Sequence, residues 1–286
     1  MKIKYLTKEA VLKFVDRALI EDIGDGDHSS LSSIPEDLSS KAQLLVKDQG
    51  VLAGMQLAKW IVARFDKTIQ FEAYLKDGQE VKTGDVAFML EGNARSILSV
   101  ERLVLNCMQR MSGIATYTKK MTDLIAGTDV KLLDTRKTTP NFRLCEKWAV
   151  KIGGGENHRY GLYDMIILKD NHVDYAGGIK NAIVAAQKYL KDSNKDLKIE
   201  VETRSLDEVK EVLETGGVDV IMLDNMLPSM MKEALHLIGG KYETEASGGI
   251  TEKNIRDIAE TGVDYISVGA LTHSYESLDF SLKAVK

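Results

Sequence analysis

Residues 197–224 read LKIEVETRSLDEVKEVLETGGVDVIMLD, and this stretch decides the fold. Its two apolar runs, at residues 197–201 and 220–223, are short and contain β-branched residues, as buried strands do. Between them, residues 206–214 repeat apolar side chains at helical spacing. A strand, a helix and a second strand in this order predict two parallel strands joined by a crossover helix.

The same alternation continues on both sides of this stretch, from about residue 115 to residue 270. Four more apolar runs predict strands at residues 130–133, 165–168, 242–246 and 265–268, and a further helix is expected at 251–260. The runs are apolar on both faces, which is typical of parallel strands covered on both sides. Polar or glycine residues directly follow all six strands: Asp134, Lys169, Glu202, Asp224, Ser247 and Gly269.

Residues suited to a ligand at every strand end favour a closed barrel over an open sheet. In a parallel α/β barrel the carboxyl ends of the strands carry the chemistry, so we expect one shared active-site face. Six strands are fewer than the usual eight, so the barrel is expected to be atypical, incomplete or closed by the first domain. Neither GxGxxG nor GxxxxGK[ST] occurs between a strand and a helix, which argues against the usual dinucleotide and P-loop sites.

The pattern before residue 115 is different, and the change predicts a domain boundary. Thr7 is a suitable cap for a helix that carries apolar residues at helical spacing, and a polar loop at 24–33 is expected to end it. Alternating apolar residues predict strands at 42–46, 69–75 and 86–90, followed by a helix at 95–111. We expect domains at residues 1–114 and 115–270, with a C-terminal helix at 271–286 that joins the first domain.

Composition narrows the class of protein. The 286 residues include 38 Lys and Arg against 43 Asp and Glu, a net charge of −5, which argues against the broad basic surface of a nucleic-acid-binding protein. The opening residues 1–5 lack the apolar core of a signal peptide, and no apolar stretch approaches the ~18 residues that span a bilayer. We therefore expect a soluble cytoplasmic protein. Cys107 and Cys145 are expected to be buried core residues rather than disulfide or zinc ligands.

Cations near the strand ends indicate an anion site. Arg136 and Arg159 offer planar groups that match carboxylate or phosphate. Lys137 and Lys169 offer point charges, and His158 adds a donor. Several charged hydrogen bonds to one anion, at roughly 1.5–3 kcal/mol each, could outweigh its desolvation.

The remaining strand ends indicate a metal and a phosphate. Glu202 and Asp224 are hard oxygen ligands suited to Mg²⁺, which often takes one or two carboxylates together with substrate phosphates. The segments after the last two strands are suited to a terminal phosphate held by backbone N–H groups: Ser247, Gly248, Gly249, Gly269 and Ala270. An anion site, a metal site and a phosphate site on one face predict a sugar phosphate that carries a diphosphate as the ligand.

Each feature taken alone is also compatible with a purely structural role. An acidic residue at one strand end is more often a helix cap or a solvated side chain than a metal ligand, and a glycine run such as residues 153–155 is often only a flexible loop. His172, His236 and His273 are expected to be structural. The functional interpretation depends on the joint placement of these residues at successive strand ends.

Seven segments, in this order, resemble those of quinolinate phosphoribosyltransferase, also called nicotinate-nucleotide pyrophosphorylase (carboxylating). They lie at residues 134–140, 153–162, 169–172, 200–202, 223–226, 245–250 and 267–270. In the first domain the resemblance extends to residues 21–27 and 101–106, so it covers nearly the whole chain. It implies an α/β fold with an N-terminal α/β sandwich domain and an atypical parallel α/β barrel of fewer than eight strands.

The resemblance also implies an activity. Members of this family condense quinolinate with phosphoribosyl pyrophosphate, with Mg²⁺, to give nicotinate mononucleotide, pyrophosphate and carbon dioxide in de novo NAD biosynthesis. By matching position, quinolinate would be bound by Arg102, Arg136, His158, Arg159 and Lys169. Lys137 and Lys169 would lie near the diphosphate, and Thr138 would be a further substrate-binding residue.

Glu202 and Asp224 would face the ribose and the metal, and the segments at Ser247 and Gly269 would hold the 5′-phosphate. The implied catalytic residues are therefore Lys137, Lys169, Glu202 and Asp224. The resemblance further implies a homodimer or higher homo-oligomer in which Arg102 reaches the neighbouring subunit's site.

Three alternatives stay open on the sequence. A related branch associated with molybdenum transport shares the barrel motifs, although the complete set of cations and Lys169-Asp170 favour quinolinate. The other two are a phosphoribosyltransferase for a different aromatic acid and a non-catalytic protein that binds sugar phosphates. Assay of substrate turnover would separate these from the favoured interpretation.

Overall fold

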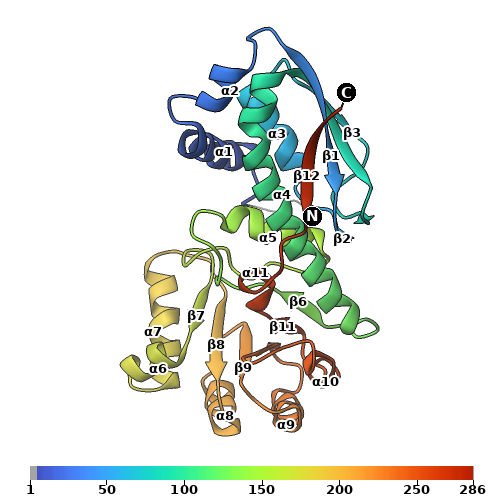
Figure 1. The fold of residues 1–286 in the computed structure, drawn as a ribbon. Coiled ribbons are helices and arrows are strands. Elements are labelled where there is room, and N and C mark those ends of the chain that lie inside the picture. The colour runs from blue at the N-terminus through green and yellow to red at the C-terminus, as the bar shows by residue number, and fades with distance from the viewer. Residues whose placement is uncertain (1–4, 286) are drawn as a thin grey trace. The chain divides into compact units, whose positions relative to one another are not determined.

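The structure is a computed structural model that describes residues 5–285 (Figure 1). Residues 1–4, on which the argument against a signal peptide rests, and residue 286, the last of the expected C-terminal helix, lie outside the described residues. The chain forms two compact units that interleave along the sequence. The first comprises Met1–Lys119, Lys137–Gly154 and Leu271–Lys286, and the second comprises Lys120–Arg136 and Gly155–Ala270.

The first unit is built on a four-stranded antiparallel sheet with the strand order β12-β1-β5-β3. Its strands are β1 (Ser39–Val46), β3 (Gln70–Ala73), β5 (Val86–Asn93) and β12 (Phe280–Val285). The short strands β2 (Gly50–Val51) and β4 (Glu80–Val81) form a separate pair. The helices are α1 (Lys8–Ile23), α2 (His28–Ser33), α3 (Met55–Phe65), most of α4 (Ala94–Leu124) and α5 (Arg143–Ile152). Figure 1 shows α1–α4 on one side of the sheet, so the expected α/β sandwich is confirmed.

The first unit contains one confirmed helix start and two wrong helix boundaries. Thr7 caps α1, because its hydroxyl accepts a hydrogen bond from the Ala10 N–H at 3.1 Å. The expected loop at 24–33 is wrong in part, since Asp27 caps α2 at residues 28–33. Helix α4 does not end near residue 111 but continues to Leu124, because its stripe of buried apolar residues continues through Ile114 and Met121. No change of secondary structure therefore occurs at residue 115.

The expected C-terminal helix at 271–286 is wrong. Only the short helix α11 (Ala270–His273) forms there, and the chain then adds β12 to the edge of the sheet beside β1. The physical reason is a period of two in the sequence, since Phe280 and Leu282 are buried whereas Lys283 is exposed.

The second unit contains a parallel sheet of six strands in the order β6-β11-β10-β9-β8-β7. The strands are β6 (Lys131–Leu133), β7 (Ile166–Leu168), β8 (Ile199–Thr203), β9 (Val220–Asp224), β10 (Glu243–Ser247) and β11 (Tyr265–Ser267). All six lie within two residues of the expected positions. The helices between them are α6 (Asp170–Ala176), α7 (Ile179–Asp192), α8 (Leu206–Thr215), α9 (Pro228–Ile238) and α10 (Ile255–Ala259), and Figure 1 shows them outside the strands.

The expectation of fewer than eight strands is confirmed, but the closed barrel is wrong. Within residues 5–285 the sheet has two edges, β6 and β7, which do not pair with each other. The place beside β6 is taken by Glu156, which forms a parallel bridge with Leu133. Its N–H donates to the Leu132 carbonyl at 2.7 Å, and its carbonyl accepts from the Asp134 N–H at 3.1 Å. These bonds use the edge groups of β6 that a seventh strand would need.

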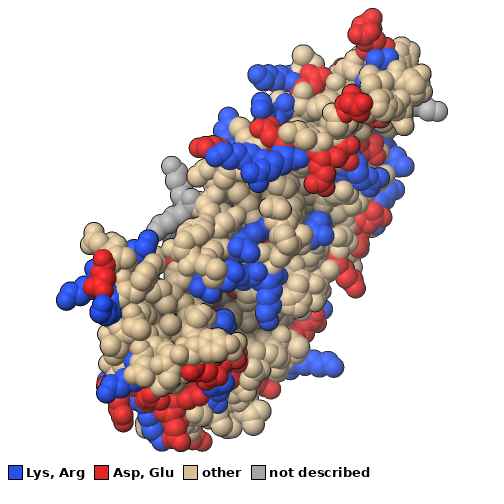
Figure 2. All heavy atoms as spheres, turned by 90° about the vertical axis from the view of Figure 1, so that its left-hand side faces the viewer, with Lys and Arg blue, Asp and Glu red and all other residues tan. Residues whose placement is uncertain are grey.

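Three further properties concern the whole chain. Cys107 and Cys145 are buried and unbridged, as expected, and burial raises the pKa of the Cys107 thiol to about 12. On the face drawn in Figure 2, the basic side chains form several groups interspersed with acidic ones rather than one continuous surface. No helix among the described residues is long and apolar enough to cross a membrane.

Candidate active site

The carboxyl ends of β7–β10 form a polar rim, which we define by Lys169, Glu202, Asp224 and Ser247. Lys169 directly follows β7, and its Nζ lies 2.7 Å from Oε2 of Glu202 on β8. Asp224 and Ser247 end the neighbouring strands β9 and β10 and are partners in the sheet register. All four expected residues therefore share one edge of the sheet, because the carboxyl ends of parallel strands meet there.

The Asp224 carboxylate is fixed by hydrogen bonds on both oxygens. Ser247 Oγ donates to Oδ1 at 2.5 Å, and Asn225 Nδ2 donates to Oδ2 at 2.6 Å. Each oxygen has a further lone pair, so the group can still accept a metal ion or a hydroxyl. The Glu202 side chain, on the adjacent strand β8, is 9% exposed, and its carboxylate is likewise a hard oxygen ligand.

The glycine segment after β10 packs against the segment after β9. Asn225 has a left-handed backbone with φ 53°, and Gly248 has φ 86°. A Cβ on Gly248 would collide with the Asn225 side chain, so this position requires glycine. Asn254 Nδ2 donates to the Gly249 carbonyl at 3.0 Å and closes the loop. The backbone at Gly248 and Gly249 is exposed at the rim, which suits an approaching anion.

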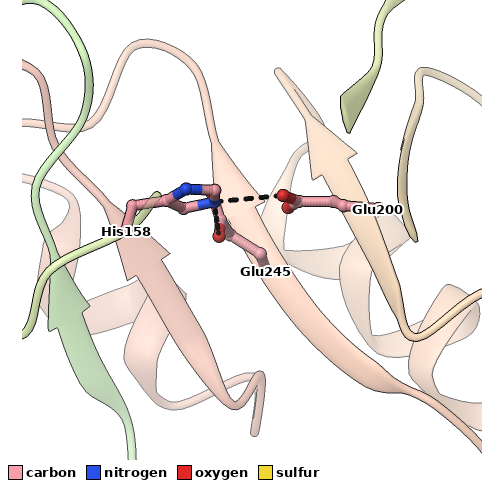
Figure 3. Close-up of side chains that lie close together, drawn as sticks. All are labelled: His158, Glu200 and Glu245. Carbon is pink, nitrogen blue, oxygen red and sulfur yellow. Dashed lines mark hydrogen bonds and ion pairs between the residues drawn. The ribbon is translucent and has the colours of Figure 1, made fainter. Parts of the chain in front are cut away.

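Below the rim lies a buried cluster, which we define by His158, Glu200 and Glu245 (Figure 3). His158 Nε2 is 3.0 Å from Oε2 of Glu200 on β8 and 3.2 Å from Oε2 of Glu245 on β10. Glu200 and Glu245 are 0% and 1% exposed. Strand β9 lies between β8 and β10, so the side chains of Glu200 and Glu245 come from alternate strands and meet at His158.

The buried cluster shares protons among its three groups. Burial by itself lowers the pKa of His158, but the hydrogen bonds and charges of Glu200 and Glu245 raise it to about 10. Burial, and then the charge of Glu245, raises the pKa of Glu200 to about 7. One proton of the cluster can lie either on the ring, giving an imidazolium between two carboxylates, or on a carboxyl group, giving a neutral ring. The net charge of the cluster is the same in both cases. The Arg159 N–H donates to His158 Nδ1 at 2.7 Å, so Nδ1 carries no proton and we assign the neutral ring with its proton on Nε2.

The segment after the cluster presents Arg159. Asp134, which is fully buried, accepts hydrogen bonds from the His158 N–H at 2.9 Å and from Asn157 Nδ2 at 2.6 Å. Arg159 Nη1 donates to the Met165 carbonyl at 2.9 Å. Burial, and then the charge of Arg136, lowers the pKa of Arg159. Arg136 and Arg159 both belong to the second unit, and their joint role in binding an anion stays a prediction.

The other expected site residues belong to the first unit, apart from two. Lys137 and Thr138 line a cavity of about 610 Å³ with Arg110, Thr139, Thr272, His273, Tyr275 and Ser277. Thr272 Oγ1 donates to the Lys137 carbonyl, and Arg143 Nε donates to Thr138 Oγ1, both at 2.9 Å. Arg102 is exposed on α4. The two exceptions, Gly269 and Ala270, follow β11 in the second unit.

The histidines differ in role, and the sequence reasoning missed two acidic residues. His172 accepts the Lys169 N–H on Nδ1 at 3.0 Å, which supports the expected structural role. Glu200 and Glu245 were not identified as site residues. The available signal was their position inside otherwise apolar strands, where an ionisable side chain without a partner would be costly.

Comparisons with known proteins give a consistent family. Models described as "Quinolinate phosphoribosyl transferase, C-terminal domain" and "N-terminal domain" match residues 114–283 and 27–112. The chain is 47% identical over 281 residues to quinolinate phosphoribosyltransferase [decarboxylating] 2, mitochondrial, of Nicotiana glauca, covering 93% of this chain and 80% of that one. It is 41% identical over 270 residues to the probable nicotinate-nucleotide pyrophosphorylase [carboxylating] of Bacillus subtilis, covering 94% and 92%. The solved nicotinate-nucleotide pyrophosphorylase of Francisella tularensis superposes with a TM-score of 0.89 at 41% identity and covers 98% of both chains.

Proposed function

The chain belongs to the quinolinate phosphoribosyltransferase family, and we propose that it transfers a phosphoribosyl group from phosphoribosyl pyrophosphate to quinolinate in NAD biosynthesis. The products are nicotinate mononucleotide, pyrophosphate and carbon dioxide. One observation carries the proposal: the rim places the cation Lys169 and the carboxylates Glu202 and Asp224 at neighbouring strand ends. This arrangement provides for an anionic acceptor and for a metal-bound diphosphate on the same edge of the sheet.

The acceptor is a dianion, and the proposed ligands of its two carboxylates are Arg136, Arg159 and Lys169. Burial, and then the charge of Arg136, lowers the pKa of Arg159, and a bound dicarboxylate would offset both by supplying negative charge. Arg102, exposed on α4, is proposed to reach the site of a second copy of the chain.

Mg²⁺ is the proposed metal, held by Glu202 and Asp224 together with the substrate diphosphate. The donor set fits this ion, because both groups are carboxylates at a half-buried rim and the Asp224 oxygens are already oriented by Ser247 and Asn225. When bound, the ion would neutralise charge that develops on the departing pyrophosphate. Lys137 is proposed to contact the diphosphate and Thr138 to bind substrate. The backbones of residues 247–249 and 269–270 are proposed to hold the 5′-phosphate.

The protein's contribution to the reaction is positioning and charge stabilisation. The C1–O bond of the ribose breaks and its electron pair leaves with pyrophosphate, while the pyridine nitrogen attacks C1 from the opposite face. Glu202 and Asp224 lie where carboxylates can stabilise the oxocarbenium-like ribose. Ribosylation makes the ring nitrogen cationic, so it accepts the electron pair when the bond to the adjacent carboxylate breaks. Carbon dioxide leaves, and the ring carbon takes a proton from solvent.

A turnover assay tests the proposal. Purified protein is incubated with quinolinate, phosphoribosyl pyrophosphate and Mg²⁺, and nicotinate mononucleotide and carbon dioxide are quantified. Nicotinate serves as the rival acceptor. We expect equal amounts of both products from quinolinate and none from nicotinate. Turnover of nicotinate without carbon dioxide would assign a different acceptor, and no turnover by folded protein would favour the transport-associated or sugar-phosphate-binding alternatives.

The proposed oligomer has a separate test. If Arg102 acts in the neighbouring site of a homodimer, Arg102→Ala and Asp224→Asn variants should each be nearly inactive alone. A mixture of the two, refolded together, would contain hybrid dimers with one intact site, so activity should return. Absence of activity in a mixture that light scattering shows to be dimeric would contradict the shared site.

The cytoplasm is the proposed compartment. Several plant relatives carry mitochondrial or chloroplastic in their names, whereas two Nicotiana relatives and the Bacillus subtilis relative carry no such label. A fluorescent fusion in the source cells, located by microscopy, would decide between the cytoplasm and an organelle.

A further inference from the structure

Both ring nitrogens of His158 contact groups of the protein. Nε2 faces the two carboxylates of the buried cluster, and Nδ1 accepts the Arg159 N–H. A neutral imidazole has one donor and one acceptor, so these contacts use both. The polar atoms of the ring are therefore turned toward the protein, which differs from the direct substrate contact that the resemblance implied.

Burial of the two carboxylates of the cluster costs free energy, and interior strands of the sheet hold them in position. Glu200 and Glu245 are almost fully buried on β8 and β10, two interior strands of the sheet. Oε1 of each has no hydrogen-bond partner among the residues that the structure describes. Burial of two carboxyl groups with half of their oxygens unsatisfied costs free energy, so stability alone does not account for them. Because interior strands are rigid, these groups can fix the position of the ring that they contact.

The His158 ring in turn fixes Arg159. Its Nδ1 binds the Arg159 N–H, while the buried Asp134 binds the His158 N–H. Arg159 Nη1 is then held by the Met165 carbonyl just before β7. The path from the sheet to the guanidinium thus runs through a continuous series of hydrogen bonds, all within the second unit.

We propose that Glu200 and Glu245 are positioning residues that hold the His158 ring, and that the ring positions Arg159 for the acceptor instead of binding the acceptor itself. The inference rests on the proposed function, because Arg159 is there assigned to a quinolinate carboxylate. The buried cluster would then support the residues that bind substrate without touching the substrate itself.

A double-mutant cycle tests the link between Glu245 and Arg159, which act on each other through the His158 ring. Glu245→Ala should raise the KM for quinolinate about tenfold, with little change in the KM for phosphoribosyl pyrophosphate. In an Arg159→Ala background, Glu245→Ala should add less than a twofold further increase, because the residue that it positions is gone. Equal factors in both backgrounds would overturn the proposal. Glu245→Gln, whose amide oxygen can still accept from Nε2, should lose less than Glu245→Ala, and thermal unfolding of all variants checks that they are folded.

Nitrogen NMR tests the ring directly and needs no activity. The chain has five histidines, so ¹⁵N-histidine labelling with a His158→Gln reference assigns the His158 ring. We expect a proton on Nε2, none on Nδ1, and both signals unchanged when quinolinate is added. A protonated Nδ1 or a shift of the ring signals with quinolinate would show direct binding. Loss of the Nε2 proton on addition of Mg²⁺ or Zn²⁺ would show a metal site, and either result would overturn the proposal.

The two tests separate this inference from the proposed function. If wild-type protein does not turn over quinolinate, the function fails while the NMR experiment still reports whether the cluster holds the ring as assigned. If turnover occurs and the cycle is additive, the function stands and the positioning role fails.

Discussion

The parallel sheet carries two acidic pairs that differ in burial and in their partners. Glu202 and Asp224 lie at the rim, half-buried, and accept hydrogen bonds from Lys169, Ser247 and Asn225. Glu200 lies two residues before Glu202 on β8, and Glu245 lies two residues before Ser247 on β10; both are buried, and their common partner is His158. Glu200 and Glu202 are even on the same face of the same strand, since side chains in a strand alternate with a period of two.

This difference shows that the surroundings of a carboxylate, rather than its residue type, decide what it can do. At the rim, polar neighbours orient the carboxylates and leave lone pairs that can bind substrate or metal. In the buried cluster, burial is the main cause that raises the pKa of Glu200 to about 7, so a proton and a histidine become its partners. The rim is suited to chemistry, and the buried cluster is suited to holding other residues in place.

The largest expected effect is on the rim. Asp224→Asn keeps the size of the side chain but removes the charge that faces the ribose and the metal. We expect kcat/KM to fall by roughly 10³-fold, as for the loss of one electrostatic contact to a transition state. Steady-state kinetics measure the fall, and the exposed Asp207→Asn on α8 is the matched control. A fall of less than tenfold would contradict the assignment of Asp224 to the rim chemistry.

A smaller effect is expected for Arg136, a proposed ligand of the acceptor. Arg136→Ala should lower kcat/KM by roughly 10- to 100-fold, the value of one charged hydrogen bond, with both KM for quinolinate and kcat affected. The control is Arg64→Ala, whose exposed guanidinium pairs with Asp16 in the first unit. Near-wild-type kinetics for Arg136→Ala would mean that the acceptor is bound elsewhere.

The smallest effect concerns the buried cluster, and it appears in stability. The pKa of Glu200 is raised from 4.5 to about 7 in the folded protein, so between these values the folded state binds more protons than the unfolded chain. The free energy of unfolding should therefore fall as pH rises through this window, by up to about 1.4 kcal/mol per pH unit, and it should continue to fall above it, because the pKa of His158 in the same cluster is raised to about 10. Urea denaturation at several pH values, without divalent ions, measures this slope.

A variant sharpens the same comparison. Glu245→Gln removes the negative charge that helps to raise the pKa of Glu200. We expect a shallower slope in that window, because the pKa of Glu200 then lies closer to its ordinary value. Asp224→Asn should leave the slope unchanged, because its carboxyl lies at the rim. An unchanged slope in Glu245→Gln would show that the two buried carboxyls are not coupled.

Local patterns predicted most of the fold. The six parallel strands were located because a short apolar run bounded by polar residues is typical of a buried strand. The errors arose where the sequence pattern was short or tertiary contacts decided. Residues 280–285 alternate over too few positions to exclude a helix, and only pairing with β1 makes them a strand. Closure of the barrel failed because Glu156, in a loop, occupies the edge of β6.

The rim could be predicted and the buried cluster could not. Asp224 and Ser247 each end an apolar run, so the register that places them side by side follows from parallel strands alone. Glu200 and Glu245 come from strands on either side of β9, and both contact His158, which lies in a loop. Their meeting therefore depends on the order of the strands in the sheet, which the sequence does not show. The placement of Lys137, Thr138 and Arg102 in the first unit likewise depends on how the chain interleaves its two units.

The packing of Asn225 against Gly248 has a consequence for evolution and engineering. A side chain on Gly248 would collide with Asn225, and the Asn225 N–H donates to the Ser247 carbonyl at 2.8 Å. The connections after β9 and β10 are therefore structurally coupled, although more than 20 residues separate them in the sequence. A chimera that takes residues 247–254 from a relative with a different residue at 225 would pair a loop with a side chain that it does not fit. We therefore expect loop grafts at this edge to succeed when both connections are exchanged together.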